Sequence, residues 1–379
     1  MSLVSIIIPM YASEKYVESF LHTMSTQDYK DIEIICVVDG SPDNTYNLAE
    51  TIAKEDSRIT VINQEHTGAG AARNVGLYMA KGEYVMFLDV DDIFPNNFIS
   101  KMVSLIENNQ ADIGICQYKH ENLKRNIIRN NAGFNNKKIK MDVASPLEID
   151  DLLGNISLVP HNKIYKRKLI RDYDLKYSST LSRNDVSFAS KFLMISKRIA
   201  FINENLYVYR QCHNDKSITS NRILHSEDII EVLKELYDWM TDHSLESQYL
   251  STFCKKVKSN IHLYSSNSRN DKFAEVTADY LASYEPWKSM DDNTLLKTAG
   301  LLIAPKKIKK LIPKKIKNKE KITKQIDSKI YNCNKIREFL NTKHNRNIKP
   351  SFIKELYLKI QDEGIDKELE KLKEKDRNK

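Results

Sequence analysis

Three aspartates lie within four positions at the end of an apolar stretch. Asp89, Asp91 and Asp92 follow Tyr84–Leu88, a run short enough to be a strand buried on both faces. Burying unpaired carboxylates is costly, so we expect them at the open end of that strand. On an extended backbone Asp89 and Asp91 project to the same side, within about 7 Å of each other. Two such carboxylates form a hard oxygen site that suits Mg²⁺ or Mn²⁺.

The same aspartates also fit the start of a helix. Asp91 or Asp92 could cap a helix that begins near Pro95-Asn96, where acidic side chains are favourable. The aspartates alone do not separate a helix cap from a metal site, so the elements around them have to decide.

Strand and helix patterns alternate from Leu3 to Tyr118. The expected strands are short apolar runs at Leu3–Ile8, which Pro9 ends, and at Ile32–Val38, Ile59–Ile62, Tyr84–Leu88 and Ile113–Tyr118. The expected helices are Glu14–Thr26, with Ser13 as its cap, Thr45–Lys54, Ala71–Ala80 and Asn96–Asn109. This alternation predicts an α/β fold in which helices cover both faces of a parallel sheet.

Polar residues follow three of these strands. They are Pro9-Met10-Tyr11 after the first, Asp39 after the second and Asp89–Asp92 after the fourth. Ligands of such sheets bind at the carboxyl ends of the strands, so we expect these residues to converge on one rim. The alternative for Asp39 is a turn or cap residue, since turn-forming residues follow it directly.

Small residues open the helix expected before the acidic strand. Gly68-Ala69-Gly70 resembles part of a dinucleotide fingerprint, but it does not follow the first strand and the spacing to a ribose-binding acid is wrong. We expect the small residues to let this helix approach the sheet closely. Arg73 could offer a cation and a planar donor fork to a base or a phosphate. A surface arginine is the alternative.

The next part of the chain carries two further candidate residues. Asp185 lies in the first turn of an expected helix, either as a partner of the helix dipole or as a general base. His213 lies in a polar loop and is a metal ligand, a partner of a pyrophosphate or neither. Before Asp185 we expect a variable loop or a pair of weak strands at 119–141 and a short helix at Pro146–Leu153. Between Asp185 and His213 we expect two short strands, at Ile199–Ile202 and Leu206–Tyr209.

Composition excludes several classes of protein. No apolar run reaches the roughly 18 residues of a membrane span, and no basic region precedes the first strand as in a signal peptide. The five scattered cysteines indicate reduced thiols in the cytoplasm. Ten lysines and one acid lie between 306 and 324, so the rest of the chain is near neutral although the net charge is +8. Nucleic acid is therefore not an expected partner of the N-terminal part.

The second half of the chain reads as helical. We expect an α/β domain over 1–220, a helical region over 221–304, a lysine-rich amphipathic segment over 305–325 and a helical, charged tail over 326–379. Lysines interleaved with isoleucines suit an anionic membrane surface. The alternative is a solvated basic linker. The lysine-rich run lacks the interleaved aromatic residues that would favour nucleic acid.

Four segments together resemble the family-2 glycosyltransferases of bacterial surface-polysaccharide synthesis, which have the GT-A fold. They occur in the family's order and spacing, at Val4–Tyr11, Val37–Thr45, Ala71–Leu77 and Leu88–Asp92. Asn162–Tyr165 and Tyr207–Thr219 also resemble family segments, so the likeness covers roughly Leu3–Thr219. It implies a mixed, mainly parallel sheet that binds a nucleotide sugar, followed by a helical C-terminal region.

The resemblance implies a donor site with named residues. Those that would line the uracil and ribose site are Pro9, Tyr11, Asp39 and, near the base, Arg73. Asp89-Val90-Asp91 would be the family's D-x-D motif, with Asp89 toward the ribose and Asp91 on the Mn²⁺ or Mg²⁺ that bridges the diphosphate. His213 is a second candidate metal ligand.

Asp185 occupies the place of the family's catalytic base. The chain departs from the family pattern at two positions, one beside Asp185 and one beside Asp39. Asn184 stands where a glutamate usually precedes the base, which puts base positioning or acceptor binding in doubt. Val38 stands where the first of two acids is common, whereas Asp39, the second, is retained.

The implied function is inverting transfer of a hexose or N-acetylhexosamine from a UDP-sugar to a hydroxyl of a glycan or lipid-linked acceptor. The expected place is the cytoplasm, with peripheral contact at the inner face of the cell membrane. One alternative is a nucleotidyl- or phospho-sugar transferase, which would release pyrophosphate instead of UDP. Another is an inactive, membrane-associated transferase-like protein, for which Asn184 is the argument.

Overall fold

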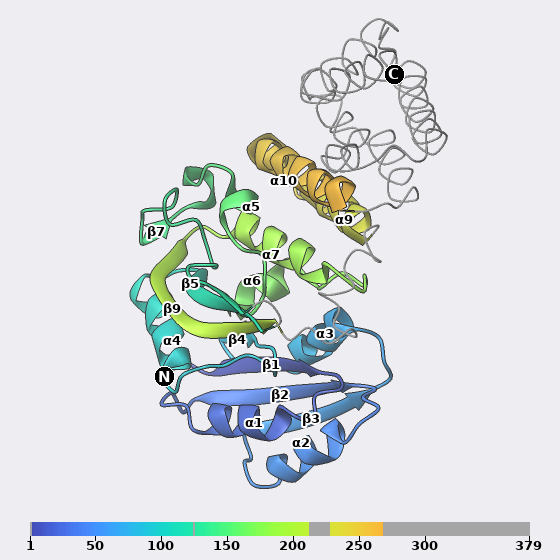
Figure 1. Cartoon of the computed structure of the whole chain (residues 1–379). Helices are drawn as coiled ribbons and strands as arrows, with labels where there is room; N and C mark the ends of the chain where they lie inside the picture. The colour runs from blue at the N-terminus through green and yellow to red at the C-terminus, as the bar shows by residue number, and fades with distance from the viewer. Residues whose placement is uncertain (1, 124–125, 212–227, 268–379) are drawn as a thin grey trace, which may run out of the picture. The chain divides into compact units, whose positions relative to one another are not determined.

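The computed structural model describes residues 2–123, 126–211 and 228–267 (Figure 1). Residues 1–255 make up the first compact unit of the chain, which contains every site residue discussed below. His213, the lysine-rich segment and the charged tail lie outside the described residues. Among the helices that are described, none is both long and apolar enough to cross a membrane.

A nine-stranded sheet runs through the described residues, in the order β3-β2-β1-β4-β8-β5-β9-β7, with β6 paired to β5. The strands are β1 (Val4–Met10), β2 (Ile32–Asp39), β3 (Ile59–Gln64), β4 (Tyr84–Phe87), β5 (Ile113–Asn122), β6 (Ile127–Arg129), β7 (Val143–Ala144), β8 (Lys163–Lys166) and β9 (Ile199–Gln211). The helices are α1 (Val17–Ser25), α2 (Thr45–Ala53), α3 (Ala69–Met79), α4 (Phe98–Asn108), α5 (Leu152–Asn155), α6 (Arg167–Asp172), α7 (Asn184–Ile195), α9 (Asp228–Asp242) and α10 (Glu246–Asn267).

The sheet is mixed and mainly parallel, as predicted. Strands β3, β2, β1 and β4 are parallel to one another. Strand β8 lies antiparallel between β4 and β5, and β9 then runs parallel to β5. The strands β1, β2, β4, β5 and β9 consequently end at the same edge of the sheet.

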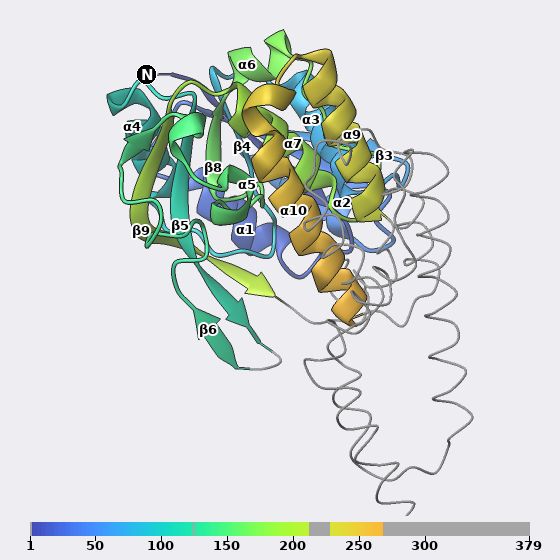
Figure 2. The same ribbon diagram turned by 90° about the horizontal axis from the view of Figure 1, so that it is seen from above.

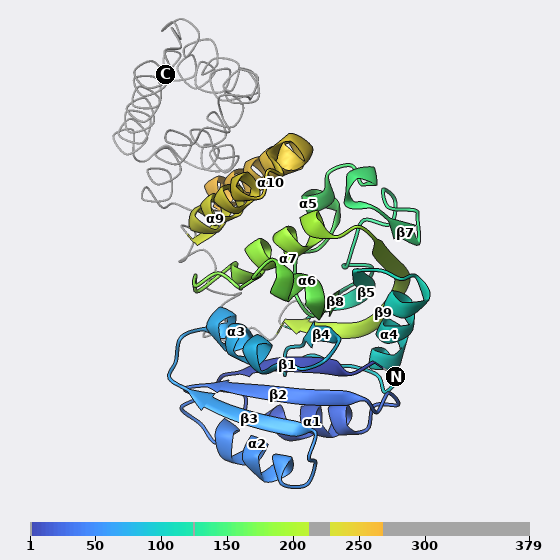
Figure 3. The same ribbon diagram turned by 180° about the vertical axis from the view of Figure 1, so that it is seen from behind.

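Helices cover both faces of the sheet, as the alternating sequence pattern predicts (Figures 1 and 3). On one face, the even-numbered residues of β1 pack with the buried residues of α1, α2 and α4. On the other face, Phe87 of β4 and Tyr165 of β8 pack against Phe188 of α7. Helix α3 lies over β1 and β2 on this second face, where Gly76 meets Ile7.

Strand β1 continues through Pro9, contrary to the expectation that this proline ends it. Odd-numbered residues of β1 direct their backbone groups toward β4, as Leu88 N donating to Ile7 O indicates. The pairing with β4 stops at Ile7 and Phe87, whereas the pairing with β2 continues to Met10. Pro9 therefore lies where no β4 partner needs an N–H donor, so the proline is tolerated.

The expected cap of the first helix is also wrong. Helix α1 begins at Val17, and its N-cap is Tyr16, with no side-chain capping bond. The Ser13 hydroxyl donates to Tyr11 O, while Ser13 O accepts from the N–H groups of Tyr16 and Val17. The main chain of Ser13 thus satisfies the donors that its side chain was expected to satisfy.

Strand β9 is one element where the sequence predicts two short strands. Its pairing with β5 shifts between Cys116 opposite Ile202 and Gln117 opposite Asn205. The intervening polar residues form an irregularity of the strand instead of a turn, so the strand continues to Gln211. The expected helix at Pro146–Leu153 is also divided, into a short 3₁₀ turn at Pro146–Glu148 and α5.

Two further expectations, for 119–141 and for the helical region after 220, agree with the structure. Strand β5 extends to Asn122 and pairs with β6, which is the pair of weak strands expected after Lys119. Helix α9 lies in the region expected to be helical and buries an apolar face, with Ile229, Ile230, Val232, Leu233 and Leu236 all inaccessible to solvent. Trp239 of the same helix is half-buried and stacks on His243.

We expect Gly76→Ala to lower the free energy of unfolding by about 1–3 kcal/mol through overpacking. A Cβ at Gly76 would lie 2.4 Å from Cγ2 of Ile7, which is fully buried and β-branched. Urea unfolding followed by circular dichroism measures the loss. Tyr78→Ala in the same helix is the control, because Tyr78 is 89% exposed. Equal stability of both variants would contradict the close approach of helix and sheet.

Candidate active site

The acidic residues lie on a tight turn directly after β4. The strand ends at Phe87, and Asp92 N donates to Asp89 O over 3.2 Å. The backbone is therefore not extended at these residues, so the expectation that an extended strand projects Asp89 and Asp91 to the same side is wrong. The turn brings Asp89 and Asp92 together instead. The Val90 side chain packs in the hydrophobic core.

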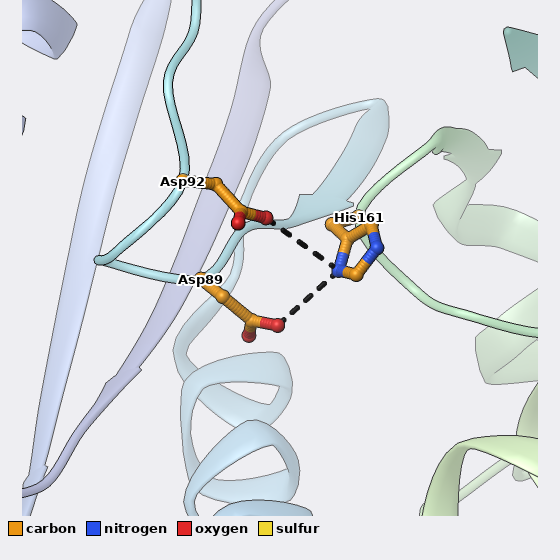
Figure 4. Close-up of side chains that lie close together, drawn as sticks. All are labelled: Asp89, Asp92 and His161. Atoms are coloured by element: carbon orange, nitrogen blue, oxygen red, sulfur yellow. Dashed lines mark hydrogen bonds and ion pairs between the residues drawn. The ribbon is translucent and has the colours of Figure 1, made fainter. Parts of the chain in front are cut away.

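Asp89 and Asp92 share a histidine that sequence reasoning did not single out. Nδ1 of His161 lies 3.2 Å from Oδ2 of Asp89 and 3.8 Å from Oδ2 of Asp92 (Figure 4). The histidine precedes β8, and its ring stacks on Tyr209 with 5.0 Å between centroids. The sequence offered one indication that His161 belongs to the site: it directly precedes Asn162–Tyr165, a segment that resembles the family.

Asp92 is not a helix cap, so that alternative is excluded. Helix α4 begins after Asn97, several residues further on. Oδ1 of Asp92 accepts a hydrogen bond from Arg210 N over 3.0 Å, and Nε of Arg210 donates to Asp91 O over 2.7 Å. The end of β9 thus holds the acidic turn in place through both main chain and side chain.

Arg73 is buried at the centre of the site, which excludes the surface alternative. Its Nη2 forms an ion pair with Oδ1 of Asp89 at 2.8 Å, and its Nη1 donates to Oδ1 of Asn184 at 3.4 Å. The guanidinium also lies over the ring of Tyr177, 5.4 Å from its centroid. Arg73 therefore joins the acidic turn to the start of α7.

The acids of the turn differ in pKa because Asp89 alone forms an ion pair with Arg73. Burial alone would raise the pKa of Asp89, but the charge of Arg73 and the hydrogen bond to His161 hold it well below its usual range. Burial and the charge of Asp89 raise the pKa of Asp91 to about 6. Burial and the two neighbouring carboxylates raise the pKa of Asp92 well above its usual range.

Asp39 lies at the end of β2, as predicted, and organises the loop before α3. Its carboxylate accepts hydrogen bonds from Thr67 N at 2.9 Å, Gly68 N at 2.8 Å and Nε2 of Gln64 at 2.7 Å. Burial would raise the pKa of Asp39, but these hydrogen bonds and His66 outweigh it and lower the pKa. The side chain is therefore a charged acceptor at the rim of the sheet.

Tyr11 and Asp39 meet through His66, which sequence reasoning did not identify as a site residue. Nδ1 of His66 lies 2.9 Å from Oδ2 of Asp39, and the His66 ring stacks on Tyr11 with 4.4 Å between centroids. Tyr11 itself is 49% exposed. The result is an exposed aromatic ring that His66 connects to a buried carboxylate. Pro9, two residues before Tyr11, is partly buried.

Asp185 lies in the first turn of α7, as the sequence predicts. Its neighbour Asn184 is buried and receives the hydrogen bond from Arg73. The start of α3 packs closely on this region, because a Cβ at Gly70 would lie 2.7 Å from Ser178 O and 3.1 Å from the Asn184 side chain. Close packing of two helix starts places Asp185 on the same side of the sheet as Arg73.

The donor set at the acidic turn fits a divalent cation. One ligand atom from each of Asp89, Asp92 and His161 lies within 4.8 Å of the others. Within the part of the chain that the structure describes, Oδ2 of Asp92 is buried without a hydrogen-bond partner. Two carboxylates and an imidazole are ligands that Mn²⁺ accepts. The carboxylate of Asp91 does not belong to this group.

Lys163 fixes the loop that carries His161. Its ammonium is fully buried and donates to Ser157 O at 2.5 Å, Val159 O at 2.7 Å and Oδ1 of Asn162 at 2.6 Å. Burial lowers the pKa of Lys163 to about 7, and the three oxygens favour the protonated form that donates to them.

Comparison with known proteins agrees with this geometry. The model of glycosyl transferase family 2 matches residues 5–174. Residues 5–174 are a family 2 glycosyltransferase domain. Glycosyltransferase GlyG of Streptococcus pneumoniae is 29% identical over 62% of this chain and 79% of its own length. The uncharacterized glycosyltransferase EpsJ of Bacillus subtilis is 33% identical over 57% of this chain and 63% of its own.

A solved structure shares the fold. TarS 1–349 of S. aureus, in complex with UDP-GlcNAc, has a TM-score of 0.53 at 20% identity and covers 92% of this chain and 93% of its own. The glycosyltransferase therefore has a GT-A-like fold. Asp39, Arg73, the acidic turn and His161 lie inside the matched residues 5–174, whereas Asn184, Asp185 and Arg210 follow them.

We expect Lys163→Met to lower the free energy of unfolding by about 2–5 kcal/mol, because it leaves three buried oxygens without a donor. Thermal unfolding monitored by circular dichroism measures the loss. Lys166→Met in the same strand is the matched control, since Lys166 is half-exposed and lies 3.9 Å from Asp112. We expect the control to change stability by less than about 0.5 kcal/mol. Similar losses in both variants would contradict the role given to Lys163.

Proposed function

We propose that this glycosyltransferase moves a hexose or N-acetylhexosamine from a UDP-sugar to a hydroxyl of a glycan or lipid-linked acceptor. The relatives support glycosyl transfer as the reaction, and the UDP-GlcNAc bound to TarS supports a UDP-linked donor. TarS is a poly(ribitol-phosphate) β-N-acetylglucosaminyltransferase and is 24% identical to this chain, which supports a surface polymer as the kind of acceptor.

The observation that carries the proposal is the link through Arg73. A buried guanidinium binds Asp89 of the D-x-D motif on one side and Asn184, the neighbour of Asp185, on the other. The acid that would hold the donor and the acid that would activate the acceptor are therefore held relative to each other. Fixed positioning of two reacting groups is a major source of enzymatic rate acceleration.

The uracil and ribose would bind at the ends of β1 and β2. Tyr11 offers an exposed ring for stacking on the base, and His66 supports that ring from behind. Pro9 and Asp39 flank this surface, and Asp39 offers a charged acceptor to base or ribose donors. Asp89 would accept from the ribose, because Arg73 keeps it ionised.

Two sets of residues could hold the divalent cation, Mn²⁺ or Mg²⁺. Asp91 is the ligand that the D-x-D motif suggests, and it stands beside Asp89 without joining the Asp89–Asp92–His161 cluster. That cluster is the second set, and among the described residues its Oδ2 of Asp92 has no hydrogen-bond partner. His213 remains a predicted ligand outside the described residues. When bound, the cation would neutralise charge on the diphosphate.

The chemistry is a single displacement. Asp185 accepts the proton of the acceptor hydroxyl, whose oxygen forms a bond to the anomeric carbon as the bond from that carbon to the diphosphate oxygen breaks. UDP leaves with the bonding electron pair. Attack from the face opposite the nucleotide inverts the anomeric configuration, and one base suffices, so no covalent intermediate is needed.

We expect Asp185→Asn to lower transfer about 10²–10⁴-fold while donor binding stays unchanged, because the amide cannot accept the hydroxyl proton. UDP release with a panel of UDP-sugars and acceptors measures transfer, and calorimetry measures UDP binding. Asp174→Asn is the control, since Asp174 lies on the surface and pairs with Lys176. Normal turnover by Asp185→Asn would exclude this base. Release of pyrophosphate instead of UDP would favour a nucleotidyltransferase.

We expect Asp91→Ala to abolish metal-dependent UDP release, because removal of this carboxylate weakens the cation's hold on the diphosphate. Mn²⁺ binding in the presence of UDP, followed by electron paramagnetic resonance, compares it with His161→Gln, which removes the histidine from the second set. Lost Mn²⁺ affinity in His161→Gln alone would show that Asp89, Asp92 and His161 are the ligands. Unchanged affinity in both variants would reject both sets.

Contact of the lysine-rich segment with an anionic membrane also stays a proposal. Its alternation of lysines with isoleucines supports it, and a lipid-linked acceptor at the inner face of the membrane would give it a use. Such contact would determine where in the cell the enzyme acts and would not change the reaction.

A further inference from the structure

The hairpin formed by the end of β5 and by β6 exposes large apolar side chains. Leu123 is 51% exposed, Ile127 39% and Ile128 61%. The hairpin extends away from the rest of the described fold in Figure 2. We refer to Leu123, Ile127, Ile128 and the exposed Arg129 as the hairpin patch.

The exposure covers both faces of the hairpin. Successive side chains of a strand point to opposite faces, yet Ile127 and Ile128 are neighbours and both are exposed. Neither face of β6 therefore covers a core. Clustered apolar side chains on a projecting surface mark contact with a partner or a membrane more often than scattered ones do.

Strand β9 connects the hairpin to the active site. Its Gln211 pairs with Asn122, the last residue of β5, and directly follows the Arg210 that holds the acidic turn. At the base of the hairpin His120 pairs with Arg129. Strands β5 and β9 end at the same edge as β4, so the hairpin patch projects from the edge that carries the site.

The charge around the patch selects among possible partners. Residues 119–131 include four lysines or arginines and one acid, Glu121. A second copy of the chain meeting the patch through its own hairpin would bring like charges together, which disfavours self-association. A polyanion would match the charge but would leave Leu123 and the two isoleucines in water. An anionic lipid surface satisfies both, since basic groups meet the headgroups while apolar side chains enter the interface.

We propose that the hairpin patch inserts into the interface of an anionic membrane. This contact is independent of the proposed reaction and of the lysine-rich segment, because it rests on exposed residues of the catalytic domain itself. If the acceptor is lipid-linked, as the proposed function includes, the contact would present the rim of the site to the membrane surface.

The test uses the full chain with a fluorescent reporter in the patch. We expect Ile128→Trp to show a blue-shifted emission, after subtraction of the wild-type signal, on mixed phosphatidylglycerol–phosphatidylcholine vesicles and none on phosphatidylcholine alone. Leu147→Trp is the matched control, because Leu147 is 62% exposed but lies in the 3₁₀ turn. We also expect Ile127→Ser/Ile128→Ser to weaken vesicle binding at least about tenfold.

Three results would overturn the proposal. The first is vesicle binding of the whole chain without a shift at position 128, which would assign binding to another segment. The second is equal binding to vesicles without anionic lipid. The third is a concentration-dependent shift in the absence of vesicles, which would show that a second copy covers the patch. Far-UV circular dichroism establishes that each variant is folded.

Discussion

The site depends on the burial of one positive charge. Arg73 is 7% exposed, and a guanidinium in such a place has to be paired. Asp89 supplies the charge and Asn184 supplies a neutral oxygen. This explains how an asparagine can stand beside Asp185: the positive charge is already balanced, so its second partner needs to accept a hydrogen bond and does not need a charge.

That pairing also sets the electrostatics of the acidic turn. Arg73 stabilises the ionised form of Asp89 alone, and the charge of Asp89 then raises the pKa of both Asp91 and Asp92. Two acids with raised pKa values at one turn form a place where a further positive charge is favourable. The backbone and guanidinium of Arg210 hold the turn from the opposite side.

Sequence reasoning predicted which strand ends form the site better than it predicted the side-chain contacts between them. Strand ends are set by local apolar runs, so the positions of Asp39 and the acidic turn at one edge followed from the pattern. The partners His66, His161 and Arg210 come from distant parts of the chain, and no local pattern brings them together. Asp92 resembled a helix cap for the same reason, because its real partners come from the segment before β8 and from β9. Pro9 resembled a strand end because the early end of β4 is not visible in the sequence of β1.

The central claim is that one base and no covalent intermediate carry the transfer. Proton NMR of the first product formed from an α-linked UDP-sugar tests it most directly, since the anomeric coupling constant reports the configuration of the new bond. The account predicts a β-linked product from the first turnover onward. An α-linked product would contradict it, because retention requires either two displacements or attack from the face of the leaving group.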